Sequence, residues 1–391
     1  PPRPADVLRH ASFTCAAPHP TRPWLATGSM SAGDGDSPGQ TVVWDLEAGE
    51  AIGASGYEHG FGFEPRPRML QWSPDGRRLA IAAGTNEIAV VEPGGEPVLF
   101  APDETRDHPV EFCWVDDHTI FAAAWSDADQ TKGGGALLSL AESEARWLTR
   151  SAVPVVLTQP VRARDASAVV GHDYREVFVI DTKGDKLISR TPLPQTFANG
   201  RSVAGWSPHG KIGVFAPPPI EQRYDRSTGR DTGGRTELVL FQPASPQALV
   251  PLEVPGEIGA IRFAPDGRRF IVLSRTVWGG VTHATVFDGA NKLGVFDAQL
   301  VRPPHHFPDA GNLVWSPDGQ HLALLRADGT IEITTPRGER RAAFAAPKSP
   351  KSPGEVGLMF VNENRVALIG QDGMTVFDTQ GTVVMRFEVE G

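Results

Sequence analysis

The chain has 391 residues, with 37 lysines and arginines against 47 aspartates and glutamates, so its formal net charge is −10. This acidic balance argues against nucleic acid as a partner, because binding to phosphate depends on clustered Lys and Arg. No apolar run is long enough to cross a bilayer, so no membrane span is expected either.

A repeating pattern fills most of the chain and is expected to start at residue 12, after an N-terminal extension over residues 1–11. The first unit, residues 12–53, contains the runs SFTCAAPHPTRPWLATGS and TVVWDLEAGEAIG. Short strand-like stretches alternate there with turn residues, as in a meander of antiparallel strands.

The second unit, residues 69–100, contains the clearest turn of the sequence, Ser73-Pro74-Asp75-Gly76. Pro presets φ at the first central position, Asp caps its own backbone, and Gly accepts the positive φ that closes a hairpin. An aromatic residue precedes the turn and an apolar strand follows it. The same arrangement recurs at residues 206–210, 263–267 and 315–319.

The stretch between Pro74 and Pro208 has room for about three repeats of ~45 residues, which predicts two degenerate units inside it. In one of them Asp116-Asp117 replaces Pro-Asp, and the other has four strand-like runs with turn residues between them. Eight units are therefore expected, at residues 12–53, 69–100, 110–148, 153–190, 202–252, 258–300, 311–344 and 356–388.

Four short strands in each unit, and no helical periodicity, predict an all-β fold. A single meander cannot bury its own faces, so neighbouring units must cover one another, as the blades of a β-propeller do. The prediction is one propeller of eight four-stranded antiparallel blades over residues 12–388, and seven blades is the alternative.

The turns with the pattern [WF]-[SA]-P-[DH]-G resemble those of the PD40 or TolB-like branch of the WD40-type propellers. Trp44-Asp45 is similar to the WD dipeptide of the wider family. The resemblance covers about residues 12–388 and implies the propeller fold. It leaves the function open, because propellers serve as enzymes, transport partners and scaffolds alike.

The expected connections differ in length according to the end of the blade from which they leave. If the strands are named a to d from the axis outward, the a–b and most c–d turns are short. The long connections fall in the b–c and d–a classes, at residues 29–40, 125–135, 216–235 and 275–283, and at residues 54–68, 101–109, 301–311 and 345–355. Insertions that gather on one face of a repeat protein predict the face where a partner binds.

The candidate binding residues are aromatic, Arg and His side chains of these long connections, because rigid aromatics and Arg commonly anchor interfaces. They are Tyr57, Phe61, Phe63, Trp125, Tyr224, Arg226, Trp278, His305, His306 and Phe307. The expected partner is another protein or a peptide, and self-association is left open.

No catalytic, cofactor or metal site is predicted. Gly205 and Lys211 fit the spacing G-x-x-x-x-G-K, but Ile212 replaces the required Ser or Thr. The Asp34–Asp36 run lacks the ligands of a calcium loop. His305 and His306 are adjacent and would point to opposite sides of an extended segment. A G-x-S-x-G nucleophile elbow does not occur in the sequence.

Cys15 and Cys113 lie in the first strands of blades that are two apart, so they are expected to stay unbridged and buried. The expected location is the cytoplasm. The periplasm is the alternative if a signal peptide preceded Pro1.

The two function hypotheses belong to different classes. One is a non-catalytic scaffold or subunit of a multi-component system, and the excess of Arg over Lys favours a bacterial one. The other is an enzyme, or a small-molecule or metal binder, with its site at the mouth of the central channel.

Overall fold

The computed structural model describes residues 11–31, 40–56, 67–83, 87–100, 107–126, 133–141, 144–148, 158–162, 168–173, 175–193, 203–208, 210–216, 224–225, 230–231, 235–242, 245, 249–275, 282–298, 300, 312–347, 357–370 and 373–388. These residues form β-strands and connections, and no helix occurs among them.

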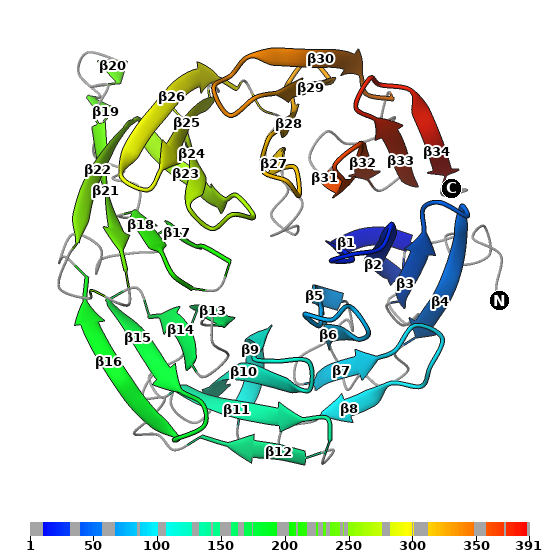
Figure 1. Cartoon of the computed structure of the whole chain (residues 1–391), viewed down its shortest axis with the longest axis vertical. Helices are drawn as coiled ribbons and strands as arrows, with labels where there is room; N and C mark the ends of the chain where they lie inside the picture. Colours follow the sequence, from blue (N-terminus) through cyan, green and yellow to red (C-terminus); the bar gives the residue numbers. More distant parts are fainter. Residues whose placement is uncertain are drawn as a thin grey trace.

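The strands form eight four-stranded antiparallel sheets arranged as blades around a central axis (Figure 1). Blade 1 consists of β1 (Ala11–Pro18), β2 (Trp24–Ser31), β3 (Gln40–Asp45) and β4 (Glu50–Gly56). Blade 2 consists of β5 (Pro67–Trp72), β6 (Leu79–Ala83), β7 (Glu87–Val91) and β8 (Val98–Phe100). Blade 3 consists of β9 (Asp107–Trp114), β10 (Thr119–Ser126), β11 (Gly133–Ser139) and β12 (Glu144–Trp147). Blade 4 consists of β13 (Thr158–Arg162), β14 (Ala168–His172), β15 (Glu176–Asp181) and β16 (Lys186–Pro192).

The second half of the ring follows the same plan. Blade 5 consists of β17 (Val203–Trp206), β18 (Gly213–Ala216), β21 (Arg235–Phe241) and β22 (Val250–Pro255), and blade 6 of β23 (Glu257–Phe263), β24 (Arg269–Arg275), β25 (Thr282–Asp288) and β26 (Asn291–Asp297). Blade 7 consists of β27 (Leu313–Trp315), β28 (Leu322–Leu325), β29 (Thr330–Thr334) and β30 (Arg340–Ala345), and blade 8 of β31 (Gly357–Asn362), β32 (Arg365–Gly370), β33 (Gly373–Asp378) and β34 (Val383–Glu388).

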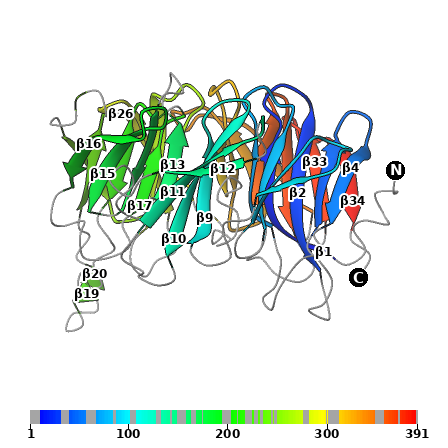
Figure 2. The ribbon, with the colours of Figure 1, turned by 90° about the horizontal axis from the view of Figure 1, so that it is seen from below.

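The predicted fold class is confirmed: the molecule is an all-β propeller with eight blades, so the seven-blade alternative is wrong. One local feature differs from the prediction. Inside the connection between β18 and β21, expected to be a loop, β19 (Tyr224–Asp225) and β20 (Arg230–Asp231) pair as a small hairpin. This hairpin projects from one side of the disc (Figure 2).

The turns between strands a and b show why the repeating motif contains these residues. In blade 2 the Ser73 hydroxyl donates to Asp75 Oδ1 at 2.6 Å and accepts from the Arg78 backbone N–H at 3.0 Å. Gly76 has φ of 72°, and its N–H donates to the Ser73 carbonyl. Blade 6 has Ala264 instead of serine, and there the Asp266 carboxylate accepts the equivalent N–H, that of Arg269, at 2.9 Å.

The apolar core is divided among the eight interfaces between neighbouring blades. Each of eight clusters of buried side chains joins the facing surfaces of two blades. Blades 2 and 3, for example, share Ile88, Phe112, Trp114 and Ile120. The long apolar strands of the sequence are therefore covered on both faces, which explains why they contain few polar residues.

Each sheet consists of strands that are consecutive in the sequence, apart from the inserted β19–β20 hairpin. Blade 1 holds the first described strands and blade 8 the last, and the two lie side by side (Figure 1). Among the described residues, the ring consequently closes by side-chain packing between blades 8 and 1, without exchange of a strand between them.

Candidate functional site

The ten predicted partner-binding residues belong mostly to segments outside the described residues. Tyr57, Phe61, Phe63, Arg226, Trp278, His305, His306 and Phe307 all fall there. The structure gives a backbone position to Trp125 and Tyr224. Tyr224 pairs with Asp231 in the β19–β20 hairpin.

Trp125 corrects one sequence expectation. We expected it at the start of the connection 125–135, but it lies within β10 and its backbone pairs with Gly133 and His108. The strand is longer than predicted because Gly133, Gly134 and Gly135, interpreted as loop glycines, extend β11 and continue the ladder. Trp125 is therefore one residue from the end of a strand.

The two sides of the disc carry different connections. We call the side with the a–b and c–d turns the turn face, and its a–b turns include residues 73–78, 115–118, 264–268 and 316–321. The opposite side, reached by the b–c and d–a connections, is the loop face, from which the β19–β20 hairpin extends (Figure 2). Antiparallel pairing requires this division, because successive turns alternate between the two ends of a sheet.

The aspartates of the turn face are engaged in local hydrogen bonds. Burial disfavours ionisation of Asp75, but hydrogen bonds from the Ser73 hydroxyl and the Arg77 N–H, together with nearby Arg77 and Arg78, hold its pKa below the ordinary value. The pKa of Asp318 is lowered against burial by equivalent bonds from Ser316 and Gln320. These carboxylates stabilise turns, as the sequence predicted, and are already engaged by their own blade.

Charged groups on the turn face also connect neighbouring blades. Arg78 of blade 2 donates from Nε to Glu92 at 3.2 Å and from Nη1 to the Asp117 carbonyl of blade 3 at 3.0 Å. The Asp75 N–H donates to Asp117 Oδ1 at 2.9 Å. Asp116-Asp117, a degenerate copy of the turn motif in the sequence, therefore accepts hydrogen bonds from the intact copy beside it.

His19 connects blades 1 and 2 in a single tautomer. Its Nδ1 accepts from the backbone N–H groups of Thr21 at 3.1 Å and Arg22 at 2.9 Å. Because the Gly76 carbonyl can only accept, Nε2 must carry the proton that it donates across the interface at 2.8 Å. A Cβ at residue 76 would lie 2.4 Å from the His19 ring, so this contact requires glycine there.

The His19 imidazole is held neutral. It lies edge-on to Trp24 and Trp72, and only 6% of the residue is exposed. Burial lowers its pKa below the ordinary value and Arg22 acts in the same direction, whereas the bond to the Gly76 carbonyl and the charge of Asp75 act to raise it. Protonation at Nδ1 would remove the acceptor for two backbone N–H groups.

The tryptophans that end several a strands bond to the preceding blade. Each indole Nε1–H of Trp72, Trp114 and Trp315 donates to a carbonyl on the a strand before it, those of Ala17, Gln71 and Arg262, at 3.0–3.2 Å. The sequence shows the aromatic residue before each turn but gives no sign of these acceptors. Trp206 departs from the pattern, because its buried Nε1 has no hydrogen-bond partner among the described residues.

Two ionisable side chains in the described part of the chain, Cys113 and His172, are buried and held uncharged. Cys15 and Cys113 are buried and not bridged by a disulfide, and burial raises the pKa of Cys113 to about 12. Burial lowers the pKa of His172 to about 3. Within the described ranges, no three His, Cys, Asp or Glu residues are grouped so that they could hold a metal, and no helix is long and apolar enough to span a membrane.

The solved structures that this chain resembles include β-propellers. The Dos1 propeller matches with a TM-score of 0.64 at 12% identity, over 95% of this chain and 93% of that one. Sqt1 of Chaetomium thermophilum, bound to the N-terminus of ribosomal protein L10, gives 0.60 at 16% identity, over 95% and 97%. The dihydro-heme d1 dehydrogenase NirN in complex with DHE gives 0.62 at 13% identity, over 98% and 74%.

No family model and no curated protein matches the chain. At these identities the structural matches show the fold alone, and the neighbours include propellers of the WD40 type.

Proposed function

We propose that this protein is a non-catalytic scaffold that holds another protein or a peptide on the loop face of its propeller. The observation that carries the proposal is the unequal length of the connections at the two ends of the blades. Six or fewer residues separate the a and b strands in every blade, as at 73–78, whereas residues 217–234 separate β18 from β21 and include the β19–β20 hairpin. A closed ring supplies a rigid base for such insertions.

Two structural neighbours support the proposal by analogy. Sqt1 is bound to the N-terminus of a ribosomal protein, and Atg21 of the KlAtg21 complex binds the coiled coil of Atg16. The internal pairing of charged groups on the turn face also supports it. The turn face has short turns whose carboxylates already accept hydrogen bonds within the protein. The loop face, with its longer connections, is therefore the better candidate for binding a partner.

The finer parts of the proposal rest on the sequence. The [WF]-[SA]-P-[DH]-G turns support membership of the PD40 or TolB-like branch, and the excess of Arg over Lys supports a bacterial source. We further propose that the protein acts in the cytoplasm as one subunit of a multi-component system.

The test is an affinity capture with matched variants. Replacing residues 217–234 by a Gly-Ser linker removes the hairpin from the loop face, and Arg77→Ala with Arg268→Ala changes two exposed side chains of the turn face. Wild type and the Arg variant should capture the same partner, and the linker variant should lose it while keeping its melting temperature. A folded linker variant that still binds, beside an Arg variant that does not, would reverse the assignment of the face.

A second variant tests individual residues of the loop face. Replacing Trp125, Tyr224 and Trp278 together with Ala should weaken capture without unfolding the protein. Loss of folding would show that these rings belong to the core instead.

The alternative, an enzyme or small-molecule binder with a site at the channel mouth, has one structural neighbour on its side, since NirN is a dehydrogenase in complex with DHE. Native mass spectrometry with elemental analysis separates the two hypotheses. A stoichiometric metal or organic group would favour the alternative, whereas an apo mass with a co-purified protein would favour the scaffold.

A further inference from the structure

The interface between blades 8 and 1, which we call the closing interface, differs from the others in how it is held. Elsewhere in the ring the chain runs directly from one blade into the next, so the two sides cannot separate far. Blade 1 and blade 8 are the two ends of the described chain, and no strand is exchanged between them. Within the described part of the chain, their association therefore depends on non-covalent contacts.

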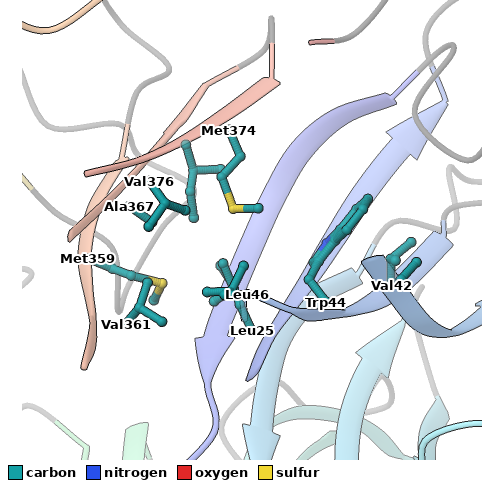
Figure 3. Packing of buried hydrophobic residues seen from close by; sticks show 12 residues of the cluster. Leu25, Val42, Trp44, Leu46, Met359, Val361, Ala367, Met374 and Val376 are labelled. Carbon is teal, nitrogen blue, oxygen red and sulfur yellow. The ribbon is translucent and has the colours of Figure 1, made fainter. Parts of the chain in front are cut away.

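The side chains of this interface are rich in methionine. The sequence contains five methionines, and three of them, Met359, Met374 and Met385, belong to the cluster that joins blades 8 and 1. Met359 and Met374 face Leu25, Trp44 and Leu46 of blade 1 (Figure 3), and Met385 packs against the same cluster. A polar contact also crosses the interface, from Arg365 Nη1 to the Leu46 carbonyl at 3.2 Å.

The three methionines lie at different depths of blade 8: Met385 is on its outermost strand β34, Met374 on β33 and Met359 on its innermost strand β31. Met359, Ala367, Val376 and Met385 form a row across the four strands of blade 8, because each is directly opposite the next in the sheet register. Met385 is on the outermost strand and only partly buried, whereas Met359 and Met374 are 3% and 1% exposed. An oxidant arriving from solvent would meet Met385 first.

Met385 also lies at ordinary packing distance from a turn of blade 1. A Cβ at Gly49, in the turn between β3 and β4, would be 3.4 Å from Met385 Cε. An oxygen added to the Met385 sulfur would place a strongly polar group among the apolar side chains of this cluster. Burying such a group without a hydrogen bond is costly, so the modified blade would pack less well against its neighbour.

From this arrangement we propose that the closing interface is a methionine-oxidation site, at which sulfoxide formation on Met385 opens the ring and exposes Met359 and Met374. The oxidant is a peroxide. The thioether sulfur forms an S–O bond to one oxygen of hydrogen peroxide as the O–O bond breaks, and the second oxygen leaves as water after accepting the proton that the transferred oxygen loses. Sulfur loses two electrons and the peroxide gains them.

This inference is independent of the proposed function, because it concerns the stability of the ring and not the identity of a partner. Oxidation at the closing interface gives the protein a reversible response to oxidants, since methionine sulfoxide can be reduced enzymatically. Met69, partly buried at the interface of blades 2 and 3, is the internal control. It has a similar degree of burial, but the chain bridges its interface.

The experiment treats the purified full chain with increasing hydrogen peroxide and follows each methionine by peptide mass spectrometry. Met385 should be oxidised first, Met359 and Met374 should follow together, and the melting temperature should fall as Met385 sulfoxide accumulates. Treatment with methionine sulfoxide reductase should restore the melting temperature. In Met385→Leu the oxidation of Met359 and Met374 should be slower, whereas Met69→Leu should leave their oxidation unchanged.

Hydrogen exchange gives a readout of opening that does not depend on the variants. After mild oxidation, amides of β1 and β31 should exchange faster, and those of β5 and β9 should keep their rates. The proposal is overturned if Met359 and Met374 react as fast in Met385→Leu as in wild type, or if oxidation of Met385 leaves exchange in β1 and β31 unchanged. If Met385→Leu fails to fold, the wild-type exchange experiment decides alone.

Discussion

Blade 1 has two neighbours, and it is joined to them by different means. Toward blade 2, directional hydrogen bonds accompany the apolar contacts: His19 donates to the Gly76 carbonyl and the Trp72 indole donates to the Ala17 carbonyl. Toward blade 8, the contacts are chiefly those of aliphatic side chains, three methionines and Trp44. The interface of blades 1 and 2 fixes the relative position of its blades, whereas the interface of blades 8 and 1 tolerates small changes in that position.

The difference has a geometrical reason. Small deviations in the angle between successive blades add up around a ring, and the interface that closes it must absorb the sum. Methionine suits this position, because its unbranched side chain fills irregular spaces and adapts to small displacements. We therefore infer that the hydrogen bonds near the turn face fix the relative positions of neighbouring blades. The methionines allow blades 8 and 1 to pack together when the ring closes.

Trp44→Ala should give the largest effect and tests the adaptable interface. Trp44 is fully buried, and its Nε1 donates to Thr27 Oγ1 at 2.8 Å. Removal of the ring should lower the free energy of unfolding by about 3–5 kcal/mol, because the cavity would not collapse completely. Urea denaturation measures this. A loss below about 1 kcal/mol would show that the methionines can refill the space, and that the interface is more plastic than we infer.

Trp72→Phe tests the directional interface with a built-in control. The change keeps an aromatic ring but leaves the buried Ala17 carbonyl without its indole donor. The free energy of unfolding should therefore fall by about 1–3 kcal/mol. Trp206→Phe is the matched change at the interface of blades 4 and 5, where the indole N–H has no partner among the described residues. In urea denaturation, Trp206→Phe should lower the free energy of unfolding less than Trp72→Phe does. Equal losses would mean that ring size, and not the hydrogen bond, determines stability.

Arg365→Met tests the polar contact of the closing interface. Loss of the bond to the Leu46 carbonyl should lower the free energy of unfolding by about 0.5–1.5 kcal/mol, since the Arg side chain is only partly buried. In the same variant, the backbone amides of β1 and β31 should exchange faster with solvent. The control is Arg365→Lys, which keeps the charge.

His19→Gln should give the smallest effect near neutral pH and one that grows on acidification. The folded pKa of His19 lies below its unfolded value near 6.5, so the unfolded chain binds the proton more readily. The stability that neutral His19 contributes is fully present above pH 6.5 and is lost as the pH falls toward the folded pKa. The melting temperature of wild type should therefore decrease more steeply than that of His19→Gln below pH 6.5. Parallel curves would exclude His19 as the titrating group.

The fold could be predicted from the sequence because its determinants are local. Each copy of the Ser-Pro-Asp-Gly turn contains its own φ preferences and hydrogen-bond groups, and the repeat spacing gave the blade number. The contacts that join blades are not local. Trp72 and His19 bond to backbone atoms of a different blade, which no short pattern predicts. The β19–β20 hairpin and the place of Trp125 in β10 were missed because their segments lack repeat signals.

The candidate site was harder to predict than the fold for a related reason. Connections such as 217–234 differ from blade to blade, so the repeat gives no template for their shape. Sequence reasoning could compare their lengths and assign them to one face, but the arrangement of the aromatic side chains on that face remains a prediction.

The contiguity of each blade has a consequence for the history and engineering of the chain. A blade that is one uninterrupted stretch of sequence can be gained or lost by duplication or deletion of a single gene segment. For the same reason, a circularly permuted chain, cut between any two blades and rejoined between Glu388 and Ala11 by a linker, would keep all eight sheets whole. Moving the cut around the ring would show how far stability depends on which pair of blades is left untethered.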